Sequence, residues 1–279
     1  MDIKQFKNFF KPYAKTVDSV NETSAFWRLS DAIIMEIIQK EIIPFCNQKT
    51  TILDAGGGTA RWAINISKNT ISKIIVFDKS EDMLAKAEEN LEKANVTEKI
   101  TLIQGDMINM SSIKNESIDH VVSIYSPLSF IYEQDKAMKE LYRITKKGSR
   151  ILIMAHGYYN ALFSKINNYK ATITELEKLE NTNRVTWAPH VPELVTHSKE
   201  TIEKLFVNTG FTPLKTFGIP VLVQPGVEDF DPDNKKVSEI SKYLENTNIF
   251  NNILKLEMRY NSMSTISNRG MSIFALAIK

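Results

Sequence analysis

The chain has 279 residues, of which 43% are hydrophobic and 24% are charged, as is usual for folded globular proteins. Lys and Arg number 35 against 33 Asp and Glu, and the formal net charge of +2 creates no overall field that would attract nucleic acid. The single cysteine excludes an intramolecular disulfide and a cysteine-based zinc cluster. No signal peptide is evident, and no stretch reaches the roughly 20 apolar residues that a membrane helix needs. We expect a cytoplasmic protein with one main core.

Short apolar runs alternate with helical patterns through the middle of the chain. The runs IIVF and ILIM are apolar without alternation, as expected of strands that are covered on both faces. The expected strands are 50–54, 73–78, 100–104, 118–125 and 150–155, and the expected helices are 59–68, 80–94 and 134–145. This alternation predicts an α/β fold in which crossover helices connect the strands of a parallel sheet.

The remaining segments predict helical covers around the same core. The segment 1–48 is expected to form an N-terminal helical cover, with Ser30 and Asp31 preceding a helix. The segment 49–279 is expected to form the main domain, with cap insertions at about 156–197 and 220–268. Helices are expected at about 161–179, 198–209 and 236–260, and strands at 211–217 and 271–278.

A glycine-rich turn between the first expected strand and its helix is the most informative segment. Gly56, Gly57 and Gly58 let the backbone approach a ligand where a Cβ atom would not fit. A dinucleotide site requires G-x-G-x-x-G, and here the sixth position is Arg61. The strand ends in Asp54, which would repel a pyrophosphate and suits a cationic amino-acid ligand. The pattern therefore favours S-adenosylmethionine over NAD.

Two further acids end the next two expected strands. Asp78 follows the glycine turn at the end of the second strand, where the ribose of an adenosine would present two hydroxyls to a carboxylate. Asp106 ends the third strand, in place to accept a hydrogen bond from an adenine amino group. These strand ends share one edge of the sheet, where open α/β sheets bind ligands. The alternative, that each Asp is only a helix N-cap, explains one such acid better than three.

This segment resembles the class I S-adenosylmethionine-dependent methyltransferases over roughly residues 50–155. The resemblance rests on LDAGGGTARW, VFDKSEDMLAKAEENL, IQGDM and DHVVSIYSPLSFI, followed by ELYRITKKGSRILIM. The family often has a third glycine where this chain has Ala60, which is the smallest replacement. The resemblance implies a Rossmann-like seven-stranded sheet, mostly parallel, with an antiparallel last strand at 272–278.

The same resemblance implies roles for individual residues toward S-adenosylmethionine. Asp54 would face the amino end of the methionine moiety, above a floor formed by Gly56 and Gly58, and Asp78 would hold the ribose. The other residues expected at the cofactor are Lys79 and Met83 beside the adenosine, Asp106 and Met107 at the adenine, and Ser123 and Tyr125 near the transferred methyl group.

A narrower resemblance rests on DAGGG, on Arg28 upstream of it, and on LKLEMRYNSMSTISNRGMSIFALA near the end. These features are similar to the bacterial methyltransferases that esterify carboxymethoxyuridine at the tRNA wobble position. We take the lineage from this resemblance and not the substrate. Arg28 is expected to clamp the cofactor's carboxylate, because a guanidinium offers a bidentate match that lysine lacks. The alternative is a surface arginine.

The residues that could carry chemistry are fewer. Methyl transfer from a sulfonium requires an aligned acceptor and the exclusion of water, and only some acceptors need a general base. His156 directly follows the fifth expected strand, and histidine titrates near neutral pH, so it is the candidate catalytic base. The alternative is a structural histidine, as expected for His120, His190 and His197. No set of His, Asp and Glu has the spacing of metal ligands, so no metal is expected.

Aromatic residues in the expected covers are candidates for the wall of an acceptor pocket, with packing of the insertions as the alternative. They are Tyr158, Tyr159, Trp187 and Tyr260. Charges from residue 156 onward are nearly balanced and the loop 228–233 is acidic, whereas an RNA substrate favours a basic face.

The sequence therefore predicts S-adenosylmethionine-dependent methyl transfer to a small-molecule oxygen, nitrogen or carboxylate acceptor, with no membrane partner. The alternatives are a tRNA-modifying methyltransferase and a cofactor-binding protein without catalysis. The oligomeric state stays open.

Overall fold

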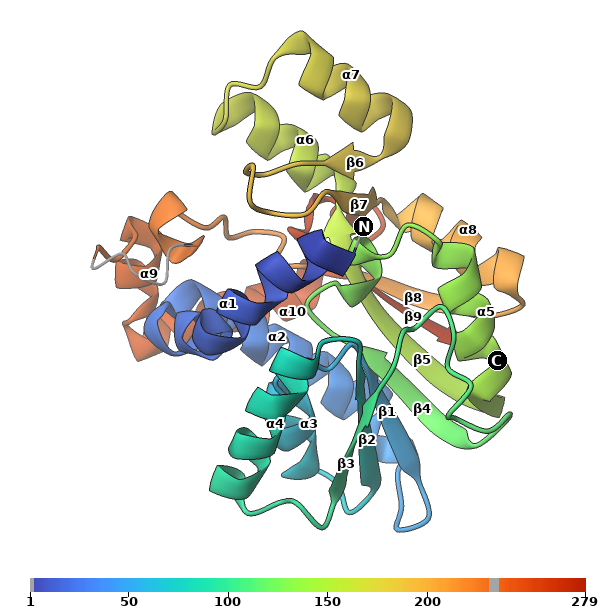
Figure 1. The fold of residues 1–279 in the computed structure, drawn as a ribbon. Coiled ribbons are helices and arrows are strands. Elements are labelled where there is room, and N and C mark those ends of the chain that lie inside the picture. Colours follow the sequence, from blue (N-terminus) through green and yellow to red (C-terminus); the bar gives the residue numbers. More distant parts are fainter. Residues whose placement is uncertain (1–2, 231–235) are drawn as a thin grey trace.

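The computed structural model describes residues 3–230 and 236–279, and within them the chain folds around a nine-stranded mixed sheet (Figure 1). The apolar runs of the sequence form its strands, as expected. The strands are β1 (Thr51–Ala55), β2 (Lys73–Asp78), β3 (Ile100–Gln104), β4 (Ile118–Ser123), β5 (Thr145–Gly157), β6 (Arg184–Val185), β7 (Leu194–His197), β8 (Thr212–Ile219) and β9 (Ser272–Ile278).

The sheet is mostly parallel and its last strand in the sequence is antiparallel to its neighbours, as the sequence predicts. Its order begins β3-β2-β1-β4-β5, and all of these strands pair in parallel. β9 runs antiparallel between β5 and β8 and pairs with both. The expected count of seven strands is too low for the described residues, because β6 and β7 add two short strands beside the end of β5.

Helices cover both faces of this sheet. They are α1 (Ile3–Thr23), α2 (Ala25–Glu41), α3 (Arg61–Ser67), α4 (Glu81–Ala94), α5 (Gln134–Ile144), α6 (Tyr158–Asn167), α7 (Ile173–Thr182), α8 (Lys199–Thr209), α9 (Glu239–Leu244) and α10 (Thr247–Tyr260). Short 3-10 turns are η1 (Ile43–Phe45), η2 (Pro127–Phe130), η3 (Val227–Phe230) and η4 (Ser267–Arg269). α2, α3, α4 and α10 pack on one face, and α5 and α8 pack on the other.

The position of strand β5 explains why apolar and polar residues do not alternate in its run ILIM. Leu152 and Met154 belong to the core on the α2 side, whereas Ile151 and Ile153 belong to the core on the α5 side. All four side chains are buried. Both faces of the strand are therefore apolar, because helices cover both sides of the sheet.

Two long helices expected from the sequence are each divided in two. The expected helix at 161–179 is divided into α6, which ends at Asn167, and α7, which begins after Thr172. The hydroxyl of Thr172 accepts from the backbone N–H of Glu175 in a capping box. The expected helix at 236–260 divides at Asn246, whose side chain caps α10. In each case a polar side chain satisfies backbone donors at the start of a new helix.

The N-terminal segment also differs from expectation in where its second helix begins. Ser24 caps α2, since its hydroxyl accepts from the backbone of Trp27. Ser30, expected at a helix start, is buried inside α2. Among the described helices, none has both the length and the apolar character needed to cross a membrane.

Candidate functional site

The carboxyl ends of β1 and β2 bring the glycine turn and two acidic residues together. The backbone N–H of Gly56 donates to Phe77 O at the end of β2, with a distance of 2.7 Å. The N–H of Gly58 donates to the carboxylate of Asp78, at 2.9 Å. The carboxylate of Asp54 lies close enough to that of Asp78 for the two to influence each other electrostatically.

The turn itself needs its glycines. Gly56 has a φ of +74° and Gly58 a φ of +54°, in the left-handed region that favours glycine. A Cβ atom on Gly56 would lie 2.4 Å from Cβ of Pro127, so η2 packs directly against the turn. Ala60 also adopts a left-handed conformation, with a φ of +62°, where the family often has glycine.

Asp54 is buried beside this turn, and its Oδ2 has no hydrogen-bond partner among the described residues. Burial raises the pKa of Asp54 to about 7, and the nearby charge of Asp78 adds to the rise. A buried carboxylate oxygen without a partner is costly, and a cationic ligand group would relieve that cost. Asp54 therefore has the properties of a ligand-binding acid.

The next two acids already have partners within the chain. Asp78 also accepts from the backbone of Ser80, at 2.8 Å, and burial raises its pKa. Asp106 forms an ion pair with Lys79, at 2.7 Å between Nζ and Oδ2. A carboxylate has about four acceptor positions, so both acids can still accept hydrogen bonds from a ligand.

Two methionines flank the glycine turn. The sulfur of Met83 lies 3.8 Å from the position of a Cβ atom on Gly58, and that of Met107 lies 3.7 Å from one on Gly56. Both methionines are almost fully buried. They provide apolar surface beside the acids, as a flat aromatic base would require.

Tyr125 lies at the end of β4 in a cluster that sequence reasoning only partly predicts. Its hydroxyl donates to Asp31 of α2, and Asp31 pairs with Arg61 at 2.5 Å. The Arg61 guanidinium lies 5.2 Å from the ring centres of both Tyr125 and Trp62. Burial, and then the charge of Asp31, raises the pKa of Tyr125, so this phenol stays protonated.

The backbone at this position is strained. Tyr125 and Ser126 have φ values of +61° and +65°, and neither is glycine. Each such residue costs on the order of 1–3 kcal/mol, and strain of this kind clusters at functional sites.

Helix α1 covers the same edge of the sheet. Asp18 accepts from the hydroxyl of Thr59 in the glycine turn, at 2.8 Å, and from the amide of Asn90 on α4, at 2.9 Å. Nearer its start, Phe10 contacts Phe130 of η2 with ring centres 5.2 Å apart. The N-terminal helix therefore contributes side chains directly above the turn.

Two predicted cofactor residues have other contacts. Arg28 pairs with Glu245, at 2.6 Å, beyond the end of α9, and its side chain is 39% exposed. On α2 the neighbours Trp27 and Asp31, one helical turn apart, face Tyr125, and Arg28 is rotated by about 100° from Trp27 and about 60° from Asp31. Ser123 is fully buried, and its hydroxyl donates to Ala55 O, which links β4 to β1.

His156 lies at the end of β5, on the edge that carries the acids. Its backbone N–H donates to the hydroxyl of Ser129, and its ring lies 5.4 Å from that of Trp187. Nε2 has no partner among the described residues. Burial lowers the pKa of His156 to about 4, so the ring is neutral at pH 7. Burial therefore disfavours titration of this histidine near neutral pH, in contrast to the sequence-based prediction, but a neutral imidazole can still accept a proton.

The predicted aromatic wall is only partly assembled. Tyr158 and Trp187 pack against a small buried cluster around Leu179. Tyr159 contacts Tyr158 but is 48% exposed. Tyr260 ends α10, which packs on α2 and α9. Among the described residues, no ring contact joins Tyr260 to the other three.

Sequence reasoning missed Arg61, Asp31 and Asp18 as site residues of this edge. Arg61 directly follows the glycine turn at the start of α3, and this position is a usable signal. In the dinucleotide pattern it counts only as the sixth position, where glycine is absent. Asp31 and Asp18 reach the edge through the packing of α1 and α2, which the sequence does not reveal.

One acid of the loop 228–233 faces the interior of the protein. Asp229 is buried and accepts from the hydroxyls of Ser24 and Ser241, at 2.8 and 2.6 Å, so it connects η3 to α2 and α9. The acids at positions 231 and 233 lie outside the described residues.

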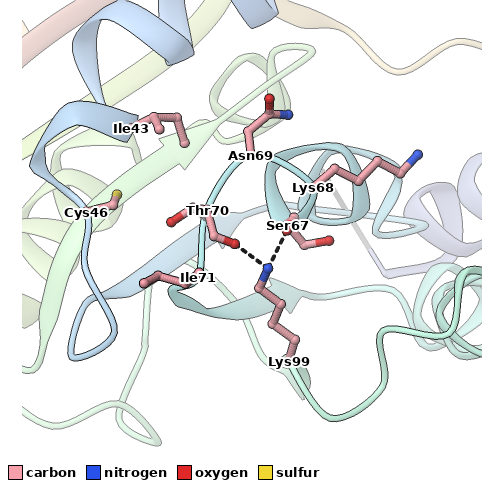
Figure 2. A pocket seen from close by; sticks show the side chains of 8 residues that line it. All are labelled: Ile43, Cys46, Ser67, Lys68, Asn69, Thr70, Ile71 and Lys99. Carbon is pink, nitrogen blue, oxygen red and sulfur yellow. Dashed lines mark hydrogen bonds between the residues drawn. The ribbon is translucent and has the colours of Figure 1, made fainter.

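A pocket of about 450 Å³ lies at the opposite edge, near the amino ends of β1, β2 and β3 (Figure 2). It is lined by Ile43, Cys46, Ser67, Lys68, Asn69, Thr70, Ile71 and Lys99. The Lys99 ammonium donates to the backbone carbonyls of Ser67 and Thr70, so it stabilises the end of α3. None of the acids described above lines this pocket.

Comparisons with known proteins agree with the fold. Residues 52–148 match a family model described as a methyltransferase domain. Over 152 residues the chain is 25% identical to the ubiquinone/menaquinone biosynthesis C-methyltransferase UbiE of Agrobacterium fabrum, covering 52% of this chain and 55% of that protein. The chain spans about half the length of the curated relatives it matches.

Solved structures share the fold at low sequence identity. The geranyl diphosphate C-methyltransferase of Streptomyces coelicolor, solved with S-adenosyl-L-homocysteine, matches with a TM-score of 0.51 and 12% identity over 84% of this chain and 72% of that one. The [4+2]-cyclase SpnF matches with a TM-score of 0.59 and 14% identity over 90% and 80%. Fold alone thus leaves the reaction open. With its matched segment 52–148, its sheet and its acid-lined glycine turn, the chain carries a class I methyltransferase domain, whose cofactor is S-adenosylmethionine.

Proposed function

We propose that this protein transfers the methyl group of S-adenosylmethionine to a small-molecule acceptor. The observation that carries the proposal is Asp54, a buried carboxylate with an unpartnered oxygen beside the glycine turn. The ammonium group of the cofactor's methionine moiety would supply the cation that this oxygen lacks. A pyrophosphate at the same position would instead add negative charge beside Asp54 and Asp78.

The other acids serve the adenosine moiety in this proposal. Asp78 accepts from the ribose hydroxyls through the acceptor positions that Gly58 and Ser80 leave open. Asp106 accepts from the adenine amino group, and Lys79 holds its carboxylate in place. Met83 and Met107 contact the flat faces of the base.

Arg61 is a better candidate than Arg28 for the cofactor's carboxylate. The glycine turn precedes Arg61 directly, and the charge of Arg61 acts on Asp54. Arg28 instead pairs with Glu245. A planar guanidinium can bind Asp31 and a ligand carboxylate with different N–H groups.

S-adenosylmethionine supplies an activated methyl group on a sulfonium, so the residues mainly align the acceptor and exclude water. Tyr125, whose hydroxyl donates to Asp31, forms one wall of the acceptor site where β4 ends. His156, neutral at pH 7, can accept a proton from an acceptor hydroxyl through Nε2. The ring of Trp187 packs edge-on against this histidine.

Two observations support a small acceptor. Helix α1 lies across the carboxyl edge through Asp18 and Phe10, which leaves little space for a folded RNA. The curated relative that the chain matches is named as a ubiquinone/menaquinone biosynthesis enzyme. A tRNA substrate and cofactor binding without catalysis remain the competing hypotheses.

The first test is calorimetry with S-adenosylmethionine and NAD. We expect binding of S-adenosylmethionine alone, and Asp78→Ala should weaken it about 10- to 100-fold, as loss of a charged hydrogen bond would. Asp135→Ala is the matched control, because Asp135 is an exposed aspartate on α5. Tight NAD binding, or equal affinity for the wild type and Asp78→Ala, would contradict the proposed site.

The second test follows methyl-labelled S-adenosylmethionine in a total cell extract that is fractionated into small molecules, RNA and protein. Label in the small-molecule fraction supports the proposal. Label in tRNA would support the first competing hypothesis, and cofactor binding without label in any fraction would support the second.

A further inference from the structure

Helix α1 presents a row of lysines to solvent. Lys7, Lys11 and Lys15 recur once per helical turn, which places them on one face of the helix, and all three are exposed. The sequence from 3 to 17 contains no acidic residue. Within the described part of the chain, these three ammonium groups form no ion pair. We call these residues the lysine row.

The opposite face of α1 is aromatic and packs on the protein. Phe9 and Phe10 contact Phe130 of η2, with ring centres 6.0 and 5.2 Å apart. The three lysine side chains are exposed beside this packed face, and the charge that they carry is available to a partner.

Helix α6 carries a second unusual surface. Tyr159, Phe163 and Ile166 recur at helical spacing, and Tyr169 follows the helix; their side chains are 48%, 49%, 48% and 51% exposed. We call these four residues the apolar stripe. The one charged residue of α6, Lys165, is buried and pairs with Glu175 at 3.0 Å. A contiguous patch of large exposed apolar side chains marks an interaction surface.

The two surfaces flank the same turn. Phe130 contacts Phe10 of α1 and also packs against the cluster that contains Ala161 of α6. In Figure 1, α6 and α7 project beyond the sheet, above the start of α1. A flat partner could therefore contact the lysine row and the apolar stripe together.

We propose that the lysine row and the apolar stripe bind the surface of an anionic lipid bilayer. Lysines near such a surface each contribute about fivefold to affinity, and aromatic and aliphatic side chains enter the boundary between headgroups and acyl chains. Single-stranded nucleic acid binds where aromatic rings lie within a positively charged groove, whereas the one charged residue of α6, Lys165, is buried and paired with Glu175. Exposed positive charge on one helix and an uncharged apolar stripe on the other thus favour lipid. This proposal revises the expectation of no membrane partner, which rested on the lack of a spanning segment.

The experiment is flotation of the full chain with phosphatidylcholine vesicles, with and without phosphatidylglycerol. We expect binding only when phosphatidylglycerol is present, and weaker binding as salt rises. The triple variant Lys7→Glu, Lys11→Glu, Lys15→Glu should bind at least about 100-fold more weakly, at fivefold per lysine. The matched control reverses Lys93, Lys147 and Lys204, three exposed lysines elsewhere, and should bind like the wild type.

The apolar stripe has its own pair of variants. Phe163→Ser with Ile166→Ser should weaken vesicle binding, whereas Ile71→Ser with Val207→Ser, at sites that are 64% and 60% exposed, should not. Melting curves establish that each variant is folded. Absence of binding to anionic vesicles, equal losses in test and control variants, or binding to tRNA but not to vesicles at the same salt would overturn the proposal.

Discussion

The guanidinium of Arg61 lies 2.5 Å from the carboxylate of Asp31, which joins the residue after the glycine turn to the middle of α2. The side chains of Arg61 and Asp31 are each about four-fifths buried, and the hydroxyl of Tyr125 donates to the same carboxylate. Three segments that are far apart in the sequence thus meet at one ion pair. The N-terminal segment is therefore part of the candidate site as well as a cover.

Arg61→Lys should weaken binding of S-adenosylmethionine by about 10- to 100-fold. Lysine keeps the positive charge but cannot donate to Asp31 and to a ligand carboxylate in one plane, and charged hydrogen bonds contribute about 1.5–3 kcal/mol. Calorimetry measures the dissociation constant, and a melting curve reports any loss of stability from the altered pair.

Arg28→Lys is the matched control for this prediction. Its partner Glu245 is exposed, and a lysine can still reach it, so the dissociation constant should stay within about twofold of the wild-type value. The reverse result, a strong effect at Arg28 and none at Arg61, would restore the clamp that the sequence predicts.

Asp54→Asn should stabilise the free protein at pH 8 and leave it nearly unchanged at pH 4. Burial raises the pKa of Asp54 to about 7, whereas the unfolded value is near 4. The folded state therefore holds its proton between these values, and the wild-type stability falls as pH rises through this window, by about 2–4 kcal/mol. Asparagine has the same shape without the charge, so its melting temperature should lack this decline.

The same substitution should weaken cofactor binding, because the amide cannot neutralise an ammonium. Measuring both quantities on one variant separates a binding role from a structural one. A variant that is destabilised at pH 8, or that binds the cofactor as tightly as the wild type, would exclude the role assigned to Asp54.

The sequence predicts the sheet and the meeting of three acids at one of its edges, because both depend on local patterns. A buried strand, a glycine turn and a capped helix each occupy a short stretch of consecutive residues, and parallel strands bring Asp54, Asp78 and Asp106 to one edge by topology alone. β2 and β3 have the predicted limits, and Ser80 caps α4 as expected.

The side chains contributed by the helical covers could not be predicted in this way. Whether Arg28 or Asp31 faces the site depends on how α2 is rotated, and that rotation is set by packing against strands that are distant in the sequence. The pKa of His156 depends in the same way on burial beside Trp187, which comes from a loop much later in the chain. Contacts of this kind have no local signal in one sequence.

Gly56→Ala should destabilise the protein more than Gly148→Ala. Both glycines have a positive φ, of +74° and +79°, so the strain of a left-handed alanine, about 1–2 kcal/mol, is common to the two variants. At Gly56 the new Cβ would also lie 2.4 Å from Pro127, whereas nothing lies within 4 Å at Gly148. Overpacking adds about 1–3 kcal/mol, which denaturant unfolding can resolve. Equal losses of unfolding free energy in the two variants would show that η2 moves away from the new Cβ atom without cost.

His156 and His197 should not titrate between pH 5.5 and 8. Burial lowers the pKa of both to about 4, and His197 also bonds to Gln134 and Thr201 through its two ring nitrogens. The chain has four histidines, so their ring protons can be followed individually by NMR. The variants His156→Gln and His197→Gln each remove one signal and so assign it.

The same shifts predict acid sensitivity with a definite sign. The unfolded chain takes up a proton at each of these histidines near pH 6.5, whereas the folded chain does so only near pH 4. Stability should therefore fall as pH drops from about 6.5 to 4, by on the order of 2 kcal/mol for His197, and His197→Gln should reduce that fall. A ring proton of His156 that titrates near 6.5 would instead mean that water reaches Nε2, and the histidine could then act as a base that titrates near neutral pH.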